Sequence, residues 1–305
     1  MEKQKIIVIL GPTSGGKSDL AVKIARKFNG EIISADSRQV YKNMDIGSGK
    51  ITKKEMLGVP HYLLSVANPK RTFTVNQYQK LAKKALVKIA KKNKFPIICG
   101  GTGLYIDSVI YDYKFPKAPP DQKLRQKLEK LKTEKLFQKL QKLDPLRAKN
   151  IDPHNRRRLI RAIEIVLTTK KPVGILRQIQ DKKMFYDFLK IGTKKTPEEL
   201  KNRIKKRLLR RLKTGIIAEV KNLHKSGLSW GKLDSFGLEY RFISRYLRGF
   251  ISRQEMIELI LKESYKYAKR QMTWFKRDKN IYWLDPDNKK DLKKIFALCR
   301  KFLKN

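Results

Sequence analysis

The sequence is poor in cysteine, in acidic side chains and in long apolar runs, and each shortage narrows the possibilities. Its 305 residues include two cysteines, Cys99 and Cys299, which are too few for a disulfide framework or a cysteine-rich zinc site. No apolar run has the length of about 20 residues that crosses a bilayer. The first apolar run already begins at Ile6, so we expect no signal peptide, no membrane partner and a cytoplasmic protein, which we take to be a monomer.

Acidic residues are heavily outnumbered. The 28 Asp and Glu stand against 73 Lys and Arg, which gives a net charge of +45 and a pI near 10.3. A chain this basic attracts polyanions. Two interpretations remain open: a nucleic-acid substrate, or an excess of lysine spread over every surface. The clustering of cations at 156–158, 194–195 and 205–211 favours nucleic acid.

One stretch carries a specific chemical signal. It matches G-x-x-x-x-G-K-[ST] at every fixed position and consists of Gly11, Pro12, Thr13, Ser14, Gly15, Gly16, Lys17 and Ser18. An apolar run precedes it and a segment of helical period follows, which is the strand–loop–helix context that the motif requires. Backbone N–H groups and the helix N-terminus would cradle a polyphosphate, Lys17 would supply a cation, and Ser18 would reach Mg²⁺. A glycine-rich turn without a ligand is the alternative.

The rest of the N-terminal part follows a βαβ rhythm, in which short apolar runs alternate with helical stretches. This rhythm predicts an α/β protein with a P-loop NTPase-like parallel sheet and helices on both faces. Over residues 1–113 we expect strands at 6–10, 31–35 and 96–99, and helices at 17–28 and 75–92.

A proline-rich hinge at 114–120 interrupts this rhythm. Residues 114–187 show leucines at helical spacing and no convincing strand, so we expect a helical insertion domain that ends near a turn at 171–174. The core then resumes over 188–305. There we expect a strand at 188–192, a helix that begins after Thr196 with Pro197 and Glu199 in capping positions, two or three further helices, and a strand at 281–284.

Two further positions belong to the edge of the sheet where ligands bind in open α/β folds. Asp36 ends the apolar run 32–35, so its carboxylate could hold Mg²⁺, directly or through water, or act as a general base. A helix N-cap is the alternative for Asp36. The segment 100–105 is a second glycine-rich turn between a strand and a helix, where Thr102 offers a hydroxyl. A plain tight turn is the alternative there.

In combination these motifs resemble the bacterial tRNA dimethylallyltransferases, also called tRNA isopentenyltransferases. The similarity runs through nearly the whole chain in six blocks: 11–18, 36–47, 100–105, 144–164, 203–220 and 268–275. The resemblance implies transfer of a dimethylallyl group from dimethylallyl diphosphate to the exocyclic N6 of adenosine 37 in tRNA, which gives N6-isopentenyladenosine.

The resemblance also implies roles for individual residues. The phosphate loop would hold the diphosphate leaving group rather than ATP, with Lys17 and a Mg²⁺ near Ser18 stabilising its charge. Asp36 matches the family's base, and Thr102 would lie near the reacting centre. Arg207, together with Arg203, would contact the diphosphate from the other side of a channel.

By the same resemblance the tRNA is gripped at its anticodon stem-loop, and adenosine 37 is extruded into the channel. The helical insertion would bind the anticodon stem. The matching positions for RNA contacts are Asp36, Ser37, Arg38, Gln39, Thr102, Arg125, Arg157, Arg158, Leu159, Ile160 and Arg161.

The chain departs from the family pattern in places. The common Gly-Ile-Gly-Tyr-Lys block appears here as 237–241 with Glu239 in place of a glycine, which puts that RNA contact in doubt, and His61 suits a packed or surface histidine better than a catalyst. Three other functions remain as alternatives: an adenylate isopentenyltransferase acting on free AMP or ATP, a small-molecule P-loop kinase, and an RNA-binding protein with a decayed phosphate site. The basic clusters argue against the first, the blocks beyond the phosphate loop against the second, and intact Lys17 and Asp36 against the third.

Overall fold

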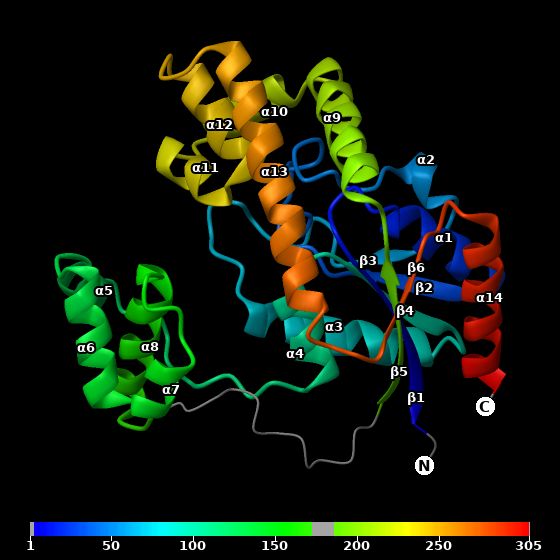
Figure 1. Ribbon diagram of the computed structural model, residues 1–305, viewed down its shortest axis with the longest axis horizontal. Helices are drawn as coiled ribbons and strands as arrows, with labels where there is room; N and C mark the ends of the chain where they lie inside the picture. The colour runs from blue at the N-terminus through cyan, green and yellow to red at the C-terminus, as the bar shows by residue number, and fades with distance from the viewer. Residues whose placement is uncertain (1–2, 173–185, 305) are drawn as a thin grey trace. The chain divides into compact units, whose positions relative to one another are not determined.

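The computed structural model describes residues 3–172 and 186–304 (Figure 1). Its contacts divide the chain into two compact units, Met1–Ile110 with Met184–Asn305, and Tyr111–Lys183. The boundaries that we predicted from the sequence lie between 113 and 114 and between 187 and 188, a few residues from this division.

The larger unit is built on a six-stranded sheet in which every neighbouring pair is parallel. Its strands are β1 (Gln4–Leu10), β2 (Gly30–Ser34), β3 (His61–Tyr62), β4 (Phe95–Gly100), β5 (Tyr186–Thr193) and β6 (Ile281–Leu284). They lie in the order β3-β2-β4-β1-β5-β6. The predicted α/β class with a P-loop NTPase-like parallel sheet is confirmed. Of these strands only β3 was missed, because two residues carry no period that a sequence reading can detect.

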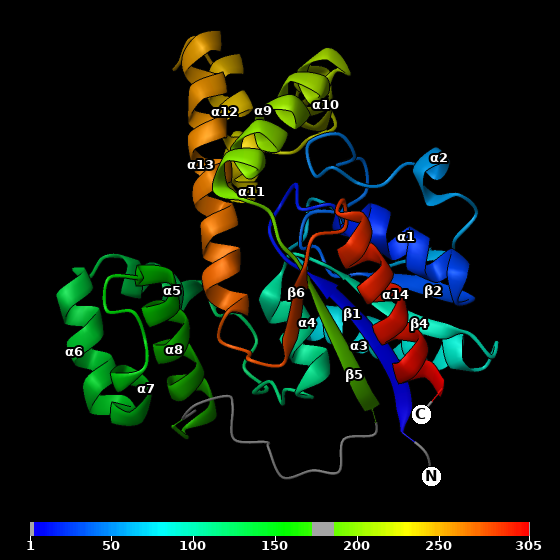
Figure 2. The same ribbon diagram turned by 45° about the vertical axis from the view of Figure 1, so that its right-hand side comes forward.

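Helices cover both faces of this sheet, so its central strands are apolar throughout. The helices that flank the sheet or lie at its edges are α1 (Lys17–Lys27), α2 (Lys53–Met56), α3 (Val75–Ala90), α4 (Gly103–Ile110) and α14 (Lys289–Lys304). Figure 2 shows α14 in front of the sheet and α3 behind it. In β1, Ile7 and Ile9 pack with α1 and α14 in one cluster, while Ile6 and Val8, on the other face, are also fully buried.

A group of helices lies beyond the carboxyl ends of the strands (Figure 1). Its members are α9 (Pro197–Lys213), α10 (Ile216–Lys225), α11 (Trp230–Phe236), α12 (Leu238–Leu247) and α13 (Arg253–Phe275). The capping box that we predicted at Thr196 and Glu199 is present at the start of α9. Within 186–304 five helices follow α9, counting α14, where we expected two or three. Gly215 and Gly237, with φ of +98° and +74°, end helices that periodicity alone runs together.

The smaller unit is helical, as expected for the insertion. It contains α5 (Gln122–Glu129), α6 (Thr133–Leu143), α7 (Pro145–Lys149) and α8 (Arg156–Thr169) around an apolar core. Leu128, Leu136, Leu140 and Leu159 are at most 3% exposed in that core. The predicted turn at 171–174 lies only partly within the described residues, since 173 and 174 fall outside them. Over the two described ranges, no helix combines the length and apolar character that a membrane span requires.

Candidate active site

The phosphate loop joins β1 to α1 and is folded tightly against β5. Gly11 and Gly16 have φ of +139° and +82°, which glycine adopts readily. A Cβ added to Gly11 or Gly15 would lie 2.5 or 2.7 Å from the hydroxyl oxygen of Thr193, so β5 leaves no room for a side chain. The glycines therefore let the backbone of the loop pack directly against β5.

Lys17 begins α1 and folds back over this loop. Its Nζ donates a hydrogen bond to the carbonyl oxygen of Pro12 at 2.6 Å. Burial lowers the pKa of Lys17 to about 8, against the opposing effects of Cys99 and Asp36 and with a smaller lowering by Arg207. A buried cation such as Lys17 has lost part of its hydration, so an incoming anion lowers its free energy more than it would that of an exposed cation.

Two features of the loop fit a phosphate ligand. The Oγ of Ser14 is buried and has no hydrogen-bond partner among the described residues. The backbone of Ser14 is strained, with a φ of +61°. Arg203 reaches the loop from α9: its Nε donates to the carbonyl oxygen of Ser14 at 2.8 Å, and its Nη1 to Asp287 at 2.6 Å. Ser18 is exposed at the first turn of α1. The structure thus brings the predicted residues Lys17, Ser18 and Arg203 to one loop.

Gln271 on α13 links the two glycine-rich turns. The backbone N–H of Thr13 donates to its Oε1 at 2.8 Å, and its Nε2 donates to the carbonyl oxygen of Gly101 at 2.9 Å. A Cβ at Gly101 would lie 2.2 Å from the Gln271 nitrogen. We did not single out Gln271 from the sequence. The signal was available, because a glutamine on the apolar face of a long helix needs hydrogen-bond partners.

Asp36 follows β2, which pairs with β4, so it lies beside the turn 100–105. Its Oδ1 accepts hydrogen bonds from the N–H groups of Arg38 at 2.8 Å and Gln39 at 3.3 Å. The segment after it forms turns rather than a helix, so Asp36 caps a turn and the helix N-cap alternative is wrong. Its Oδ2 has no hydrogen bond among the residues that the structure describes and remains available to a ligand.

Thr102 ties the second turn to the Asp36 segment. Its Oγ1 accepts the N–H of Ser37 at 3.0 Å, and its own N–H donates to the carbonyl oxygen of Ala35 at 3.1 Å. Thr102 therefore holds its own turn against the segment that contains Asp36.

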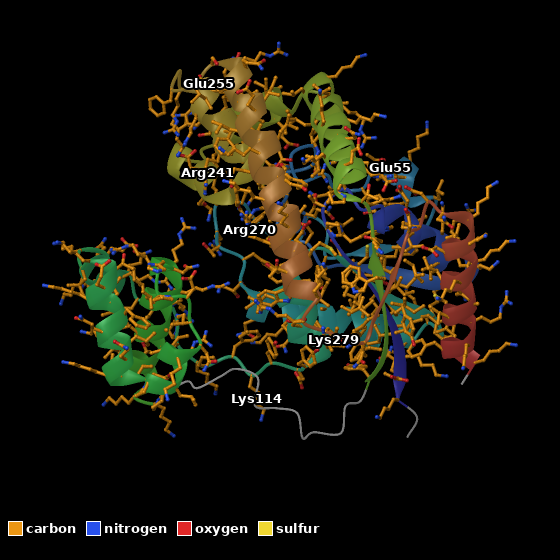
Figure 3. All side chains as sticks on the ribbon, viewed as in Figure 1. Glu55, Lys114, Arg241, Glu255, Arg270 and Lys279 are labelled. Atoms are coloured by element: carbon orange, nitrogen blue, oxygen red, sulfur yellow. The ribbon has the colours of Figure 1, made fainter. Side chains whose placement is uncertain are left out.

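A cavity of about 260 Å³ opens at this edge of the sheet. Asp36, Thr13 and Arg207 line it, and α12 and α13 supply much of the remaining wall. Figure 3 labels Arg241 and Arg270, which extend from these two helices. The lining contains five arginines: Arg38, Arg207, Arg211, Arg241 and Arg270.

Two of these arginines differ in how their charge is balanced. Arg211 pairs with Glu239, and both side chains are less than 10% exposed. Glu239 stands where the family pattern has a glycine. In this chain its carboxylate neutralises the charge of Arg211. Arg207 has no hydrogen bond or ion pair within the described ranges. Burial and the neighbouring charge of Arg211 lower the pKa of Arg207, opposed by Glu239 and Asp36, but a guanidinium keeps its proton at neutral pH.

The predicted RNA-binding residues of the insertion differ in accessibility. Glu164 is fully buried and accepts hydrogen bonds from Arg125 and Arg161. Arg125 thereby joins α5 to α8, while Arg161 bonds within α8 and to the carbonyl oxygen of Ala118. Leu159 and Ile160 are at most 7% exposed in the core, and their side chains cannot reach RNA without unfolding the unit. Arg157 and Arg158 are exposed. Among the predicted contacts of α8, the proposal therefore rests on these two.

Fold and site together define an α/β protein of the P-loop class. One cavity is lined by a residue of the phosphate loop, by the Asp36 carboxylate and by Arg207, an arginine without an ion pair among the described residues. Comparison with known proteins gives the family.

A model of the IPP transferase family matches residues 39–278. A tRNA dimethylallyltransferase of Acetivibrio thermocellus is 41% identical over 98% of this chain and 97% of its own. A tRNA dimethylallyltransferase of Anoxybacillus flavithermus is 41% identical over 92% of this chain and 90% of its own. The chain belongs to the IPP transferase family.

Solved structures agree with this. A tRNA isopentenylpyrophosphate transferase of Bacillus halodurans is similar with a TM-score of 0.74 and 35% identity, over 99% of this chain and 97% of its own. A eukaryotic dimethylallyltransferase, whose structure is described as acting on tRNA, has a TM-score of 0.83 and 26% identity, over 99% of this chain and 80% of its own.

Proposed function

We propose that this protein transfers a dimethylallyl group from dimethylallyl diphosphate to N6 of adenosine 37 in tRNA. The observation that carries the proposal is the shared cavity. Asp36 and Arg207 line one space beside Thr13 of the phosphate loop, and among the described residues one Asp36 oxygen has no hydrogen bond and Arg207 has no anionic partner. The relatives named above, tRNA dimethylallyltransferases among them, support the same reaction.

The cationic groups suit a diphosphate leaving group. When the allylic C–O bond breaks, both bonding electrons stay with the diphosphate, whose negative charge increases. Lys17, the N–H groups at the start of α1 and the Ser14 hydroxyl face that charge from the loop, and Arg207 faces it from α9. Preorganised donors of this kind stabilise a transition state because they need not reorganise as charge develops.

The carboxylate suits the acceptor. An adenine N6 is a weak nucleophile because its lone pair is delocalised into the ring. As N6 bonds to the allylic carbon, one of its protons must leave, and Asp36 Oδ2 is placed to take it. Oδ1 meanwhile keeps the hydrogen bonds of Arg38 and Gln39, so the carboxylate holds its orientation while it acts as general base.

Mg²⁺ fits this site as a partner of the substrate. Within the described ranges no group of three or more His, Cys, Asp or Glu side chains could hold a metal ion. The exposed Ser18 hydroxyl and the phosphate oxygens are suitable ligands, since Mg²⁺ in proteins usually keeps several waters and binds substrate phosphates. Bound there, the ion would neutralise charge on the diphosphate.

Free AMP or ATP is the alternative acceptor. A free nucleotide would need no basic insertion, whereas exposed cations such as Arg157 and Arg158 suit the phosphates of an RNA stem. We therefore propose the anticodon stem-loop as the partner of the insertion, and the cytoplasm as the place of reaction.

A transfer assay separates these possibilities. Radiolabelled dimethylallyl diphosphate is supplied with Mg²⁺ and, in parallel, an anticodon stem-loop RNA, AMP or ATP. We expect label on the RNA alone. Label on AMP or ATP alone would assign the protein to the free-nucleotide class. Tight RNA binding without any labelled product would contradict the proposed enzyme.

A further inference from the structure

A single carboxylate holds three consecutive backbone N–H groups beside the cavity. Glu219 of α10 accepts hydrogen bonds from the N–H groups of Asp45, Ile46 and Gly47, at 2.8, 2.6 and 3.0 Å. The phenol of Tyr240 on α12 donates a fourth, at 2.9 Å. Hydrogen bonds to an ionised group are among the strong ones, so this carboxylate fixes the segment 45–47.

The segment matters because it continues into the cavity wall. Gly47 and Ser48 line the cavity together with Asp36. The ring of Tyr240 lies so close that a Cβ at Gly47 would be 2.6 Å from its Cζ. The distance between the segment 45–47 and α12 is thus set by Gly47, by the Tyr240 ring that packs on it, and by the Glu219 carboxylate that bonds to both residues.

The wall is also connected to the turn that contains the proposed base. Gln39 donates its N–H to Asp36 Oδ1, and its side-chain Nε2 donates to the carbonyl oxygen of Gly49 at 3.0 Å. The segment and the turn of Asp36 therefore form one hydrogen-bonded wall, in which Asp36 keeps its own bonds to Arg38 and Gln39. The segment has a second support in Lys50, whose Nζ donates to Asp45 Oδ1 and to the carbonyl oxygen of Tyr41 at 2.8 Å. Local turns, such as Gly49 N–H to Ile46 oxygen at 3.1 Å, do not fix its place in the molecule.

The phosphate loop is held by a different set of residues. Gln271 and Arg203 bind it from α13 and α9, and within the described residues neither of them bonds to Glu219 or to 45–47. The two sides of the cavity can therefore be disturbed separately.

We propose that Glu219 is a positioning residue that sets the acceptor side of the cavity, so that its loss weakens binding of the RNA acceptor and not of the prenyl diphosphate. This inference rests on the proposed function for the identity of the acceptor. The role of Glu219 would thus be to position the acceptor, which differs from holding the diphosphate and from accepting the proton.

The test uses Glu219→Gln, which keeps one acceptor oxygen but removes the charge, and the milder Tyr240→Phe, which removes one donor. We expect the Kd and KM for stem-loop RNA to rise about tenfold in Glu219→Gln and less in Tyr240→Phe. The KM for dimethylallyl diphosphate should stay unchanged and kcat should fall by no more than about threefold. Hydrogen exchange should accelerate in the peptide that covers 42–50 and not in the one that covers 11–18.

Glu31→Gln is the matched control, because Glu31 is also a multiply bonded carboxylate but lies at the opposite end of β2, where it pairs with Tyr62 and Lys92. It should lose stability with no change in either KM. The proposal fails if the RNA Kd is unchanged in both variants, or if both substrates weaken equally. The RNA Kd does not depend on turnover, so a wild-type protein that binds RNA without transferring the group would contradict the proposed function and still decide this inference.

Discussion

At the scale of single residues, we propose that Asp36 accepts a proton and that Lys17 and Arg207 stabilise negative charge. These roles differ in what they need from the surroundings. A base needs a free oxygen in a fixed orientation, and Asp36 has one because its other oxygen is held by two N–H groups. A charge stabiliser needs to lack a protein anion, as Arg207 does among the described residues.

Replacing the base should separate binding from chemistry. We expect Asp36→Asn to lower the single-turnover rate of transfer by about 10²–10⁴-fold, the usual range for a general base, while RNA affinity changes little. Rapid-quench measurement of label transfer and fluorescence anisotropy of RNA binding would check the two parts. Asp187→Asn, on an exposed aspartate at the start of β5, should change neither. An Asp36→Asn protein with undiminished transfer would remove Asp36 from the role of base.

The lowered pKa of Lys17 predicts opposite effects of pH on binding and on stability. Lys17 must be protonated to attract diphosphate, so affinity should fall about tenfold per pH unit above about pH 8. The unliganded protein should gain stability from Lys17 between about pH 8 and 10.5, because the unfolded chain binds the extra proton there. Calorimetric titration with an unreactive prenyl diphosphate analogue and thermal unfolding test both trends. Lys17→Gln should weaken binding and flatten its pH dependence, and an unchanged profile would contradict the assignment.

At the scale of elements, the cavity depends on helices that reach back to the sheet from late in the chain. Helix α13 holds both glycine-rich turns through Gln271, and α9 holds the phosphate loop through Arg203. These bonds join residues between 170 and 258 positions apart. The residues of the phosphate loop are therefore adjacent in the sequence, while the residues that hold the loop in place lie far along the chain.

Removing the link on α13 should loosen both turns. We expect Gln271→Ala to lower the unfolding free energy by about 1–3 kcal/mol, because it leaves the Thr13 N–H without its partner, and to weaken binding of the prenyl diphosphate. Gln254→Ala is the control. Gln254 lies on the same helix but is exposed, and within the described ranges its side chain bonds to Glu258 alone, one turn away, so its effect should stay within about 0.5 kcal/mol. Denaturant unfolding and calorimetry measure the two quantities. Equal effects in both variants would refute the linking role of Gln271.

The elements also show how far a sequence predicts such a site. The phosphate loop, β1, β5 and the capped start of α9 follow from local rules, since each is specified by adjacent residues. The roles of Gln271 and Glu219 could not be predicted in this way. Their hydrogen-bond partners lie far away in the sequence, and a single polar residue in a helix gives no indication of which partners it will have. The separation of α11 from α12 was missed for a simpler reason, which is that only the backbone angle of Gly237 reveals the break.

At the scale of the whole molecule, the dominant property is the net charge of +45. Charge alone cannot distinguish RNA binding from a generally basic surface. The insertion offers a distinction, because Arg125 and Arg161 are engaged by Glu164 while Arg157 and Arg158 are exposed. Only a cation that meets a phosphate contributes to the salt dependence of binding.

A salt titration applies this distinction. We expect Arg158→Ala to weaken stem-loop RNA binding and to reduce the slope of log K against log salt by about 1, with no change in prenyl diphosphate affinity. Lys293→Ala, on the exposed face of α14, keeps the same net charge as that variant and should leave the slope unchanged. If the two variants change the slope equally, the charge acts as a general property and the insertion has no special part in RNA binding.

The most direct test of the central claim is to locate the transferred group. A stem-loop RNA labelled by the wild-type protein is digested to nucleosides and analysed by mass spectrometry, beside an RNA in which guanosine replaces adenosine 37. The account predicts N6-isopentenyladenosine from the first RNA, formed at position 37, and no product from the second. Product from both RNAs, or an alkyl group at another position, would contradict a cavity in which Asp36 receives the N6 proton of one extruded adenosine.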